Sequence, residues 1–371
     1  MPMLRSTDRK QGVVLLDTRQ TTPAHEHSVH LKLAERLAQL FHTEVVTPAQ
    51  PPTAKENFYY LPTETLIGLA RYRAMGISAP TDLYGGLVSQ PYMATKAISH
   101  PLPADARFPL GWTDDFARLA SDALLRGYSV FSLDDAIRAA ELLLREGPLR
   151  LKPVRATAGR GQTVANNMKE LERALGSMDA QEIALWGLTL EENLSEVQTF
   201  SVGQTLVAGI LCSYYGTQQL TRDHQGADIY GGSDLVLVRG DYDALLQLEL
   251  ENHLRLAITQ ARIYEQAALQ AFPGFIASRR NYDIARGLNS QGKLRSGVLE
   301  QSWRIGGASS AEVLALQAFA GDPALTRVRA STHEAFDAPE LPADATVFYQ
   351  GDDSEIGSVC KYARIRDYDH P

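Results

Sequence analysis

The order of apolar and polar positions predicts that strands alternate with helices near the start of the chain. Residues 12–17 form an unbroken apolar run, which is typical of a strand covered on both faces. Apolar residues then recur at helical spacing over 28–41, and strand-like runs lie on either side of a second helical pattern that starts at Glu64. Such alternation favours an α/β layer with a mainly parallel sheet.

The pattern changes after a proline-rich stretch at 100–109, which predicts a domain boundary. Helical patterns over 114–125 and 134–145 flank a short strand-like run. Strands then dominate from Leu149 until a long helical pattern over 246–272. The chain therefore reads as an α/β domain followed by a larger α+β body.

Composition and charge narrow the class of protein. The 371 residues are 44% hydrophobic and 22% charged, and 36 basic against 44 acidic residues give a net charge of −8. These values are typical of a globular protein of two or three domains and disfavour a dedicated nucleic-acid binder. Two cysteines disfavour a disulfide framework or a cysteine zinc site. A polar start and the lack of an apolar run of about 20 residues predict a cytoplasmic protein without a membrane partner.

The first segment with candidate chemistry covers residues 149–164. Lys152 ends an apolar run, and a small, glycine-bearing turn over 157–161 leads into a second strand. Glycines let backbone N–H groups approach phosphate oxygens, and a nearby lysine neutralises them. A plain hairpin with a surface lysine is the alternative. Neither the P-loop motif nor the dinucleotide-binding glycine motif is present, which disfavours those two nucleotide folds.

The second segment is a predicted hairpin that turns near 289–292. A two-residue loop pairs Asp283 with Val298, and the same loop one residue later pairs it with Glu300. In both registers the two carboxylates share one face of the hairpin, because side chains alternate with a period of two. A three-residue loop would break this arrangement.

Carboxylates on one face repel each other unless a cation neutralises them. Mg²⁺ that bridges Asp283 and Glu300 to phosphate oxygens is one solution, and Ser302 and Arg304 continue along the same face if the strand extends that far. A surface cluster of ion pairs is the alternative. A third segment, between the other two, carries Glu191 and Glu196 near a turn, where they either accept hydrogen bonds from a nucleoside or lie in a solvated acidic loop.

The three segments together resemble the ATP-grasp superfamily, in the same order, over about residues 93–311. In that family two α+β subdomains clamp ATP behind an α/β pre-ATP-grasp domain. The resemblance implies a pre-ATP-grasp domain over 1–100, a first subdomain with the glycine-rich flap over 101–190, a second with the metal-binding hairpin over 191–325, and a C-terminal extension over 326–371. It points to an uncharacterised, biotin-carboxylase-like or carboxylate–amine ligase branch.

The resemblance also implies roles for individual residues. Lys96 and Lys152 would hold phosphates, Glu191 the adenine and Glu196 the ribose, while Lys152 and Arg304 would act in catalysis. Ser302 stands where the family usually has an asparagine metal ligand. The flap residues are Thr157, Gly159, Arg160 and Gly161; the metal ligands are Asp283, Glu300 and Ser302; the candidate substrate contacts are Arg222, His224, Tyr230, Arg280, Gly306 and Gly307.

The activity implied by the resemblance is ATP- and Mg²⁺-dependent ligation. A carboxylate would be activated as an acyl phosphate and attacked by an amine or similar nucleophile, so the partners would be small molecules. A small-molecule kinase and a nucleotide-binding sensor without turnover are the alternatives. Many members of the superfamily are dimers, so a homodimer is expected. The histidines His25, His27 and His30 are interpreted as a helix entrance rather than a metal site.

Overall fold

The computed structural model describes residues 9–19, 21–155, 161–222, 228–336, 340–353 and 356–368. At its start, two small sheets hold parallel strand pairs, β1 with β2 and β3 with β4. The predicted parallel α/β layer is therefore confirmed. The helical pattern from Glu64 is corrected, because its first apolar residues form β3 and helix α2 begins at Leu69. The elements are β1 (Val13–Leu16), α1 (Ala24–Leu40), β2 (Tyr59–Pro62), β3 (Leu66–Ile67), α2 (Leu69–Ala74) and β4 (Gly86–Val88).

A four-stranded antiparallel sheet in the order β5-β8-β6-β7 follows the short helix α3 (Asp115–Leu119). Helix α4 covers this sheet with a stripe of Ala136, Ala139, Ala140 and Leu143, the spacing of one helix face. Its elements are β5 (Gly127–Val130), α4 (Leu133–Leu144), β6 (Leu149–Pro153), β7 (Thr163–Ala165), α5 (Met168–Leu175), α6 (Ala180–Trp186) and β8 (Leu188–Glu192).

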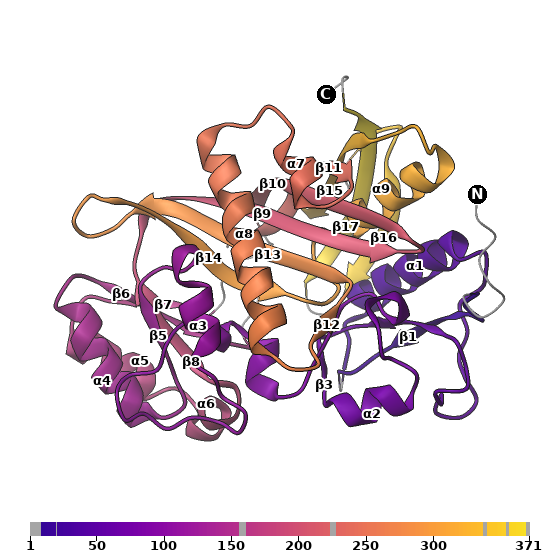
Figure 1. The fold of residues 1–371 in the computed structure, drawn as a ribbon. Coiled ribbons are helices and arrows are strands. Elements are labelled where there is room, and N and C mark those ends of the chain that lie inside the picture. Colours follow the sequence, from indigo (N-terminus) through magenta and orange to yellow (C-terminus); the bar gives the residue numbers. More distant parts are fainter. Residues whose placement is uncertain are drawn as a thin grey trace.

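An eight-stranded antiparallel sheet forms the centre of the protein, in the order β14-β13-β9-β10-β11-β15-β17-β16 (Figure 1). Its strands are β9 (Ser195–Val207), β10 (Ile210–Arg222), β11 (Asp228–Arg239), β13 (Arg279–Leu288), β14 (Leu294–Ser302), β15 (Arg327–Phe336), β16 (Thr346–Asp353) and β17 (Gly357–Asp367). The short β12 (Ile276–Ala277) instead pairs with β4 and so ties the first part of the chain to the segment before β13.

Two helices cover opposite faces of the large sheet, while α7 (Tyr242–Leu246) is a short connection. Helix α8 (Asn252–Ala271) packs on Tyr282 and Ile284 in one hydrophobic core. Helix α9 (Ser309–Gly321) packs on Leu235 and Ala330 in another. The pairing register places Leu235 and Tyr282 on opposite sides of the sheet, so α8 and α9 cover opposite sides. On the side of the sheet that α9 covers, the part formed by β13 and β14 is left for polar side chains.

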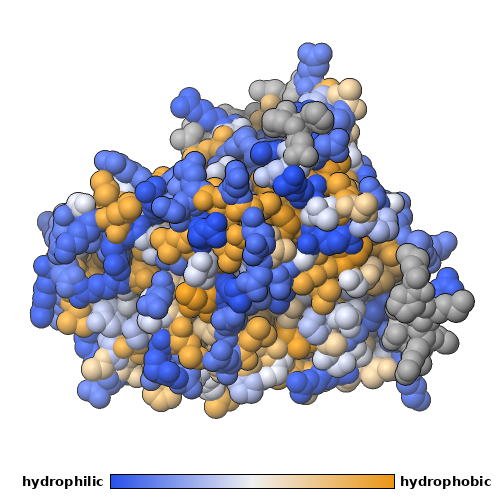
Figure 2. Space-filling model, turned by 45° about the horizontal axis from the view of Figure 1, so that its top comes forward, coloured by the Kyte–Doolittle hydropathy of each residue, from blue (hydrophilic) through white to orange (hydrophobic). Residues whose placement is uncertain are grey.

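The mixed fold class is thus confirmed, while the predicted domain limits stay a prediction. The predicted limit between 190 and 191 falls within β8, and the stretch predicted as a C-terminal extension supplies β15, β16 and β17 to the large sheet. No helix in the described ranges has the length and apolar character needed to cross a membrane. Hydrophilic and hydrophobic residues are interspersed over the face shown in Figure 2.

Candidate active site

The β13–β14 hairpin places Asp283 directly opposite Glu300. The loop has three residues rather than two, because Asn289 pairs with Lys293 through an N–H···O bond and Gly292 has a φ of 70°, which glycine adopts without strain. A β-bulge between Asp283 and Ile284 then shifts the register by one residue. The predicted loop length is therefore wrong, but the bulge compensates for it, and the predicted common face of the two acids is confirmed.

The two carboxylates differ in their neighbours. Asp283 accepts hydrogen bonds from the side-chain amides of Gln218 at 2.9 Å and Asn281 at 3.1 Å. Burial and the charge of Glu300 nevertheless raise its pKa to about 6. Glu300 instead forms an ion pair with Lys96. Burial opposes its ionisation, but Lys96 and then Lys152 lower the pKa of Glu300. The pair therefore holds one firmly ionised acid and one that is easily protonated.

This electrostatic conflict predicts that Asp283→Asn stabilises the protein when metal is chelated. The pKa of Asp283 is raised on folding, so its stabilising contribution is present below about pH 4 and is lost as the pH rises through 6. At pH 7.5 we expect the variant to gain about 1 to 2 kcal/mol of unfolding free energy, less than the full shift implies because Asp283 is partly exposed. Urea unfolding with EDTA at pH 7.5 and 4 measures this gain.

The gain should shrink towards zero at the lower pH. Asp367→Asn is the matched control, because Asp367 is exposed at the end of β17. Equal stability of the Asp283 variant and the unaltered protein at pH 7.5 would contradict the raised pKa.

Two lysines from separate parts of the chain lie close to the acid pair. Lys96 begins the short 3-10 helix Lys96–Ile98 and is 4% exposed. Lys152 on β6 is 1% exposed, and its ammonium donates to Glu191 and to the carbonyl oxygen of Leu299, both at 2.9 Å. Because Leu299 is the neighbour of Glu300 on β14, Lys152 links the small sheet to the hairpin.

Glu191 on β8 is held ionised by its contacts with Lys152 and His100. Burial opposes the ionisation of Glu191, but Lys152 and then His100, which lies 3.3 Å from the second carboxylate oxygen, lower its pKa to about 2. Burial lowers the pKa of Lys152, which Glu191 opposes. Glu191 is thus a counter-ion for Lys152, and its role at an adenine stays a prediction.

A cleft of about 390 Å³ opens over the acid pair, on the face of the large sheet away from α8. That volume is within the range of small-molecule sites. A Cβ at Gly307 would lie 2.5 Å from the Tyr230 ring, so only glycine permits this close approach. The cleft brings together these residues singled out in the sequence: Lys152, Tyr230, Asp283, Glu300, Ser302, Arg304, Gly306 and Gly307.

Other residues singled out in the sequence lie elsewhere. The predicted substrate contact of Arg280 is corrected. Side chains alternate along β13, so Arg280 points to the face of the sheet that α8 covers, where it contacts Glu265 at 3.2 Å and Gln204. Glu196 is exposed near the start of β9, outside the cleft lining, and Arg222 is exposed at the end of β10. Gly161 is exposed with a φ of 70°. The remaining four, Thr157, Gly159, Arg160 and His224, lie outside the described residues.

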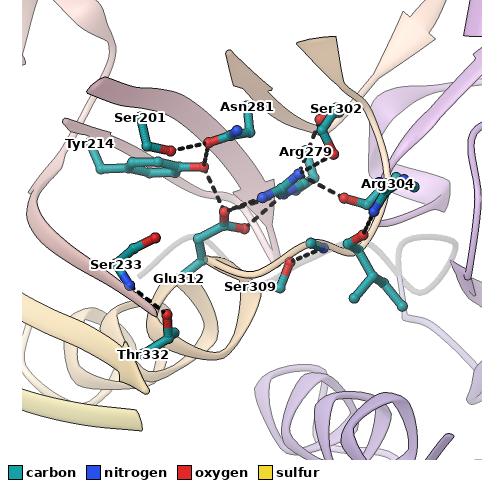
Figure 3. A network of polar contacts seen from close by, with 12 residues as sticks. Ser201, Tyr214, Ser233, Arg279, Asn281, Ser302, Arg304, Ser309, Glu312 and Thr332 are labelled. Carbon is teal, nitrogen blue, oxygen red and sulfur yellow. Dashed lines mark hydrogen bonds and ion pairs between the residues drawn. The ribbon is translucent and has the colours of Figure 1, made fainter. Parts of the chain in front are cut away.

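A buried ion pair beneath the cleft was not found by sequence reasoning. Arg279 donates to Glu312 at 2.7 Å, and the two side chains are 1% and 0% exposed (Figure 3). Glu312 also accepts hydrogen bonds from Tyr84 and from Tyr214, the latter at 2.6 Å. A lone glutamate within the apolar pattern of residues 309–321 was the available signal, because such an acid needs a buried partner.

The same arginine positions the segment after β14. Its guanidinium donates to the carbonyl oxygens of Ser302 at 3.0 Å and Arg304 at 2.7 Å, and to the Ser302 hydroxyl at 3.2 Å. A hydroxyl that already accepts a bond from a guanidinium is a poor metal ligand, which disfavours that predicted role for Ser302. Arg279 instead fixes the backbone that carries Arg304 into the cleft.

Comparison with known proteins places the chain in a family. A family model described as "Protein of unknown function (DUF3182)" matches residues 13–363. The chain belongs to this family. The family description names no activity, and no curated protein matches the sequence of this DUF3182 member.

Solved structures show remote likenesses to this DUF3182 chain. D-alanyl-alanine synthetase A from Vibrio cholerae is 13% identical, with a TM-score of 0.45 over 80% of this chain and 89% of that one. Phosphoribosylamine–glycine ligase from Thermotoga maritima is 12% identical, with a TM-score of 0.48 over 96% of this chain and 92% of that one. D-alanine–D-alanine ligase from Bacillus anthracis, solved with ATP, is 10% identical, with a TM-score of 0.44 over 84% of this chain and 92% of that one. TM-scores below 0.5 assign neither a fold nor an activity to this chain.

The residues of the cleft fit a metal ion that is shared with a phosphate ligand. Among the described residues of this DUF3182 member, no group of three His, Cys, Asp or Glu side chains is placed to hold a metal ion by itself. Mg²⁺ in proteins is commonly bound by one or two carboxylates together with substrate phosphates. Asp283 and Glu300, paired on one face of the cleft, supply that donor set.

Proposed function

We propose that this DUF3182 member is an ATP- and Mg²⁺-dependent ligase of the ATP-grasp type, which activates a small carboxylate for attack by an amine or similar nucleophile. One observation carries the proposal: Asp283 and Glu300 face each other in the cleft while Lys96 and Lys152 approach them from two other segments. Lysines bind phosphate oxygens and paired carboxylates bind Mg²⁺, so the cluster is complementary to a metal-bound polyphosphate.

The ion pair between Lys96 and Glu300 gives a physical route to binding. Without nucleotide, each side chain neutralises the other. A phosphate offers Lys96 a second anion, and Glu300 is then available to a cation. Mg²⁺, when bound, supplies the charge that neutralises phosphoryl oxygens. Lys152 stays anchored by Glu191 and Leu299, which fixes its ammonium at the base of the cleft.

A carboxylate substrate is supported by Arg304. Arg304 and Glu300 both line the cleft, and among the described residues the Arg304 guanidinium donates only to the carbonyl oxygen of Ile305. A guanidinium matches a carboxylate or phosphoryl group in a two-pronged geometry. In the proposed reaction a carboxylate oxygen attacks the γ-phosphorus, and the bond to the β–γ bridging oxygen breaks with loss of ADP. The nucleophile then displaces phosphate from the acyl phosphate and loses a proton.

Trapping with hydroxylamine tests this proposal. Purified protein, Mg·ATP and a panel of carboxylic acids are incubated with hydroxylamine, which converts an acyl phosphate to a stable hydroxamate. We expect hydroxamate and ADP in equal amounts with at least one acid, and only in the presence of Mg²⁺. A stable phosphorylated product without hydroxamate would identify a kinase, and nucleotide binding without any product would identify a sensor; either result contradicts the ligase.

A further inference from the structure

A second cavity of about 250 Å³ adjoins the cleft. The two cavities share Arg304, Gly306, Gly307 and Glu334, which form the wall between them. The second cavity extends towards the first part of the chain, because Glu26, Val29 and His30 of α1 line it. The segment before β3 supplies Glu64 to its lining, and the next residue is tied to the segment after β14, because the Thr65 hydroxyl donates to the carbonyl oxygen of Trp303 at 3.2 Å. A molecule in the second cavity would therefore reach the acid pair past Arg304.

Most of the charges in this cavity neutralise one another. Arg19 forms an ion pair with Glu26, and Lys361 forms one with Glu334 at 3.0 Å. Two opposite charges are left over: Arg304 and Glu64 have no ion-pair partner among the described residues. The charge of Glu64 acts on the Arg304 guanidinium, yet the two do not form an ion pair. The cavity is thus lined by a cation and an anion that do not form an ion pair with each other or with another described residue.

A buried histidine adds an unpaired polar group. His30 on α1 lines the cavity and is 4% exposed, and its buried Nδ1 atom has no hydrogen-bond partner in the described ranges. Burial and then Arg19 lower its pKa to about 4, so the ring is neutral near pH 7. A neutral imidazole has one donor and one acceptor nitrogen, and leaving the buried one unpaired costs free energy. The cavity therefore has a polar group ready for a ligand.

We propose that the second cavity binds a small amino-bearing carboxylic acid in its zwitterionic form, the carboxylate at Arg304 and the ammonium at Glu64. The order along the cavity follows from the lining, because Arg304 borders the acid pair and Glu64 lines only the far cavity. His30 lies in the same cavity and hydrogen-bonds a further polar group of the ligand. The inference rests on the proposed function, since it identifies the class of acid that would be activated.

Matched ligand pairs test this assignment. The full chain, saturated with Mg²⁺ and a non-hydrolysable ATP analogue, is titrated calorimetrically with the proteinogenic amino acids, their D-enantiomers and their β-amino counterparts. Each is compared with the acid that lacks the amine and the amine that lacks the acid. We expect at least one amino acid to bind, and its amine-free analogue to bind roughly ten- to a hundred-fold more weakly, because Glu64 then lacks its partner.

The variant Glu64→Gln gives the second measurement. The variant should weaken the binding of the amino acid by a similar factor and leave the affinity for the Mg²⁺-bound ATP analogue unchanged. Glu35→Gln, at an exposed position on α1, is the control and should alter neither. The ligand pairs need no variant, so they decide the matter even if Glu64→Gln fails to fold.

The assignment is overturned if no amino acid binds, if amine-free acids bind equally well, or if Glu64→Gln leaves amino-acid affinity unchanged. Those results leave the proposed function in place as long as the unaltered protein binds the Mg²⁺-bound analogue. If it does not bind that analogue, the proposed function itself fails, and the assignment falls with it.

Discussion

Replacement of Glu300 by glutamine is expected to remove the Mg²⁺-dependent part of ATP binding and to lower turnover by about 100-fold or more. Glutamine keeps the size of the side chain but is a much weaker ligand for Mg²⁺, which prefers carboxylate oxygens. The same change leaves Lys96 without its counter-ion. We therefore expect the variant to bind metal-free ATP at least as tightly as the unaltered protein does.

Thermal unfolding with ATP, with and without Mg²⁺, separates the two effects. A ligand at 100 times its dissociation constant stabilises the folded state by about 2.7 kcal/mol, so loss of the Mg²⁺-dependent part is readily measured. Glu141→Gln, at an exposed position on α4, is the matched control. Full turnover of Glu300→Gln, or an undiminished response to Mg²⁺, would show that this acid does not bind metal.

The pairing of Glu300 with Asp283 shows how far a sequence pattern predicts a site. Alternating apolar residues and the turn signal at 289–292 predicted the hairpin and the shared face of the acids. They did not predict the bulge at Asp283, because a bulge depends on the neighbouring strand as well as on the hairpin. There Asp283 pairs with Ser201 of β9, a contact between residues far apart in sequence.

Contacts between distant segments account for the other differences. Which of Arg279 and Arg280 faces the cleft depends on the register of β13, and one residue of uncertainty exchanges them. Nothing near Lys96 in the sequence indicates that its partner is Glu300, and the ion pair becomes visible only once the fold joins the two segments. The His100 contact with Glu191 is of the same kind.

Arg279, the buried neighbour of the predicted substrate contact Arg280, is expected to contribute strongly to the free energy of unfolding. Arg279→Met should lower the free energy of unfolding by about 3 to 5 kcal/mol, because it leaves the carboxylate of Glu312 buried without a cation. The tyrosine hydroxyls that still donate to Glu312 do not neutralise its charge. Urea unfolding measures the loss, and Arg118→Met, an exposed arginine paired with Asp115, should leave stability nearly unchanged.

A second substitution separates charge from packing. Glutamine at position 312 still accepts hydrogen bonds from the tyrosines but carries no charge, so Arg279→Met with Glu312→Gln should regain part of the lost stability. It cannot replace the bonds from Arg279 to the backbone of Ser302 and Arg304. Nucleotide-dependent turnover should therefore stay low in the double variant. A double variant less stable than Arg279→Met alone would mean that packing, and not the unpaired charge of Glu312, sets the cost. Recovery of stability without recovery of turnover would show that Arg279 supports turnover by positioning the segment that holds Arg304 in the cleft.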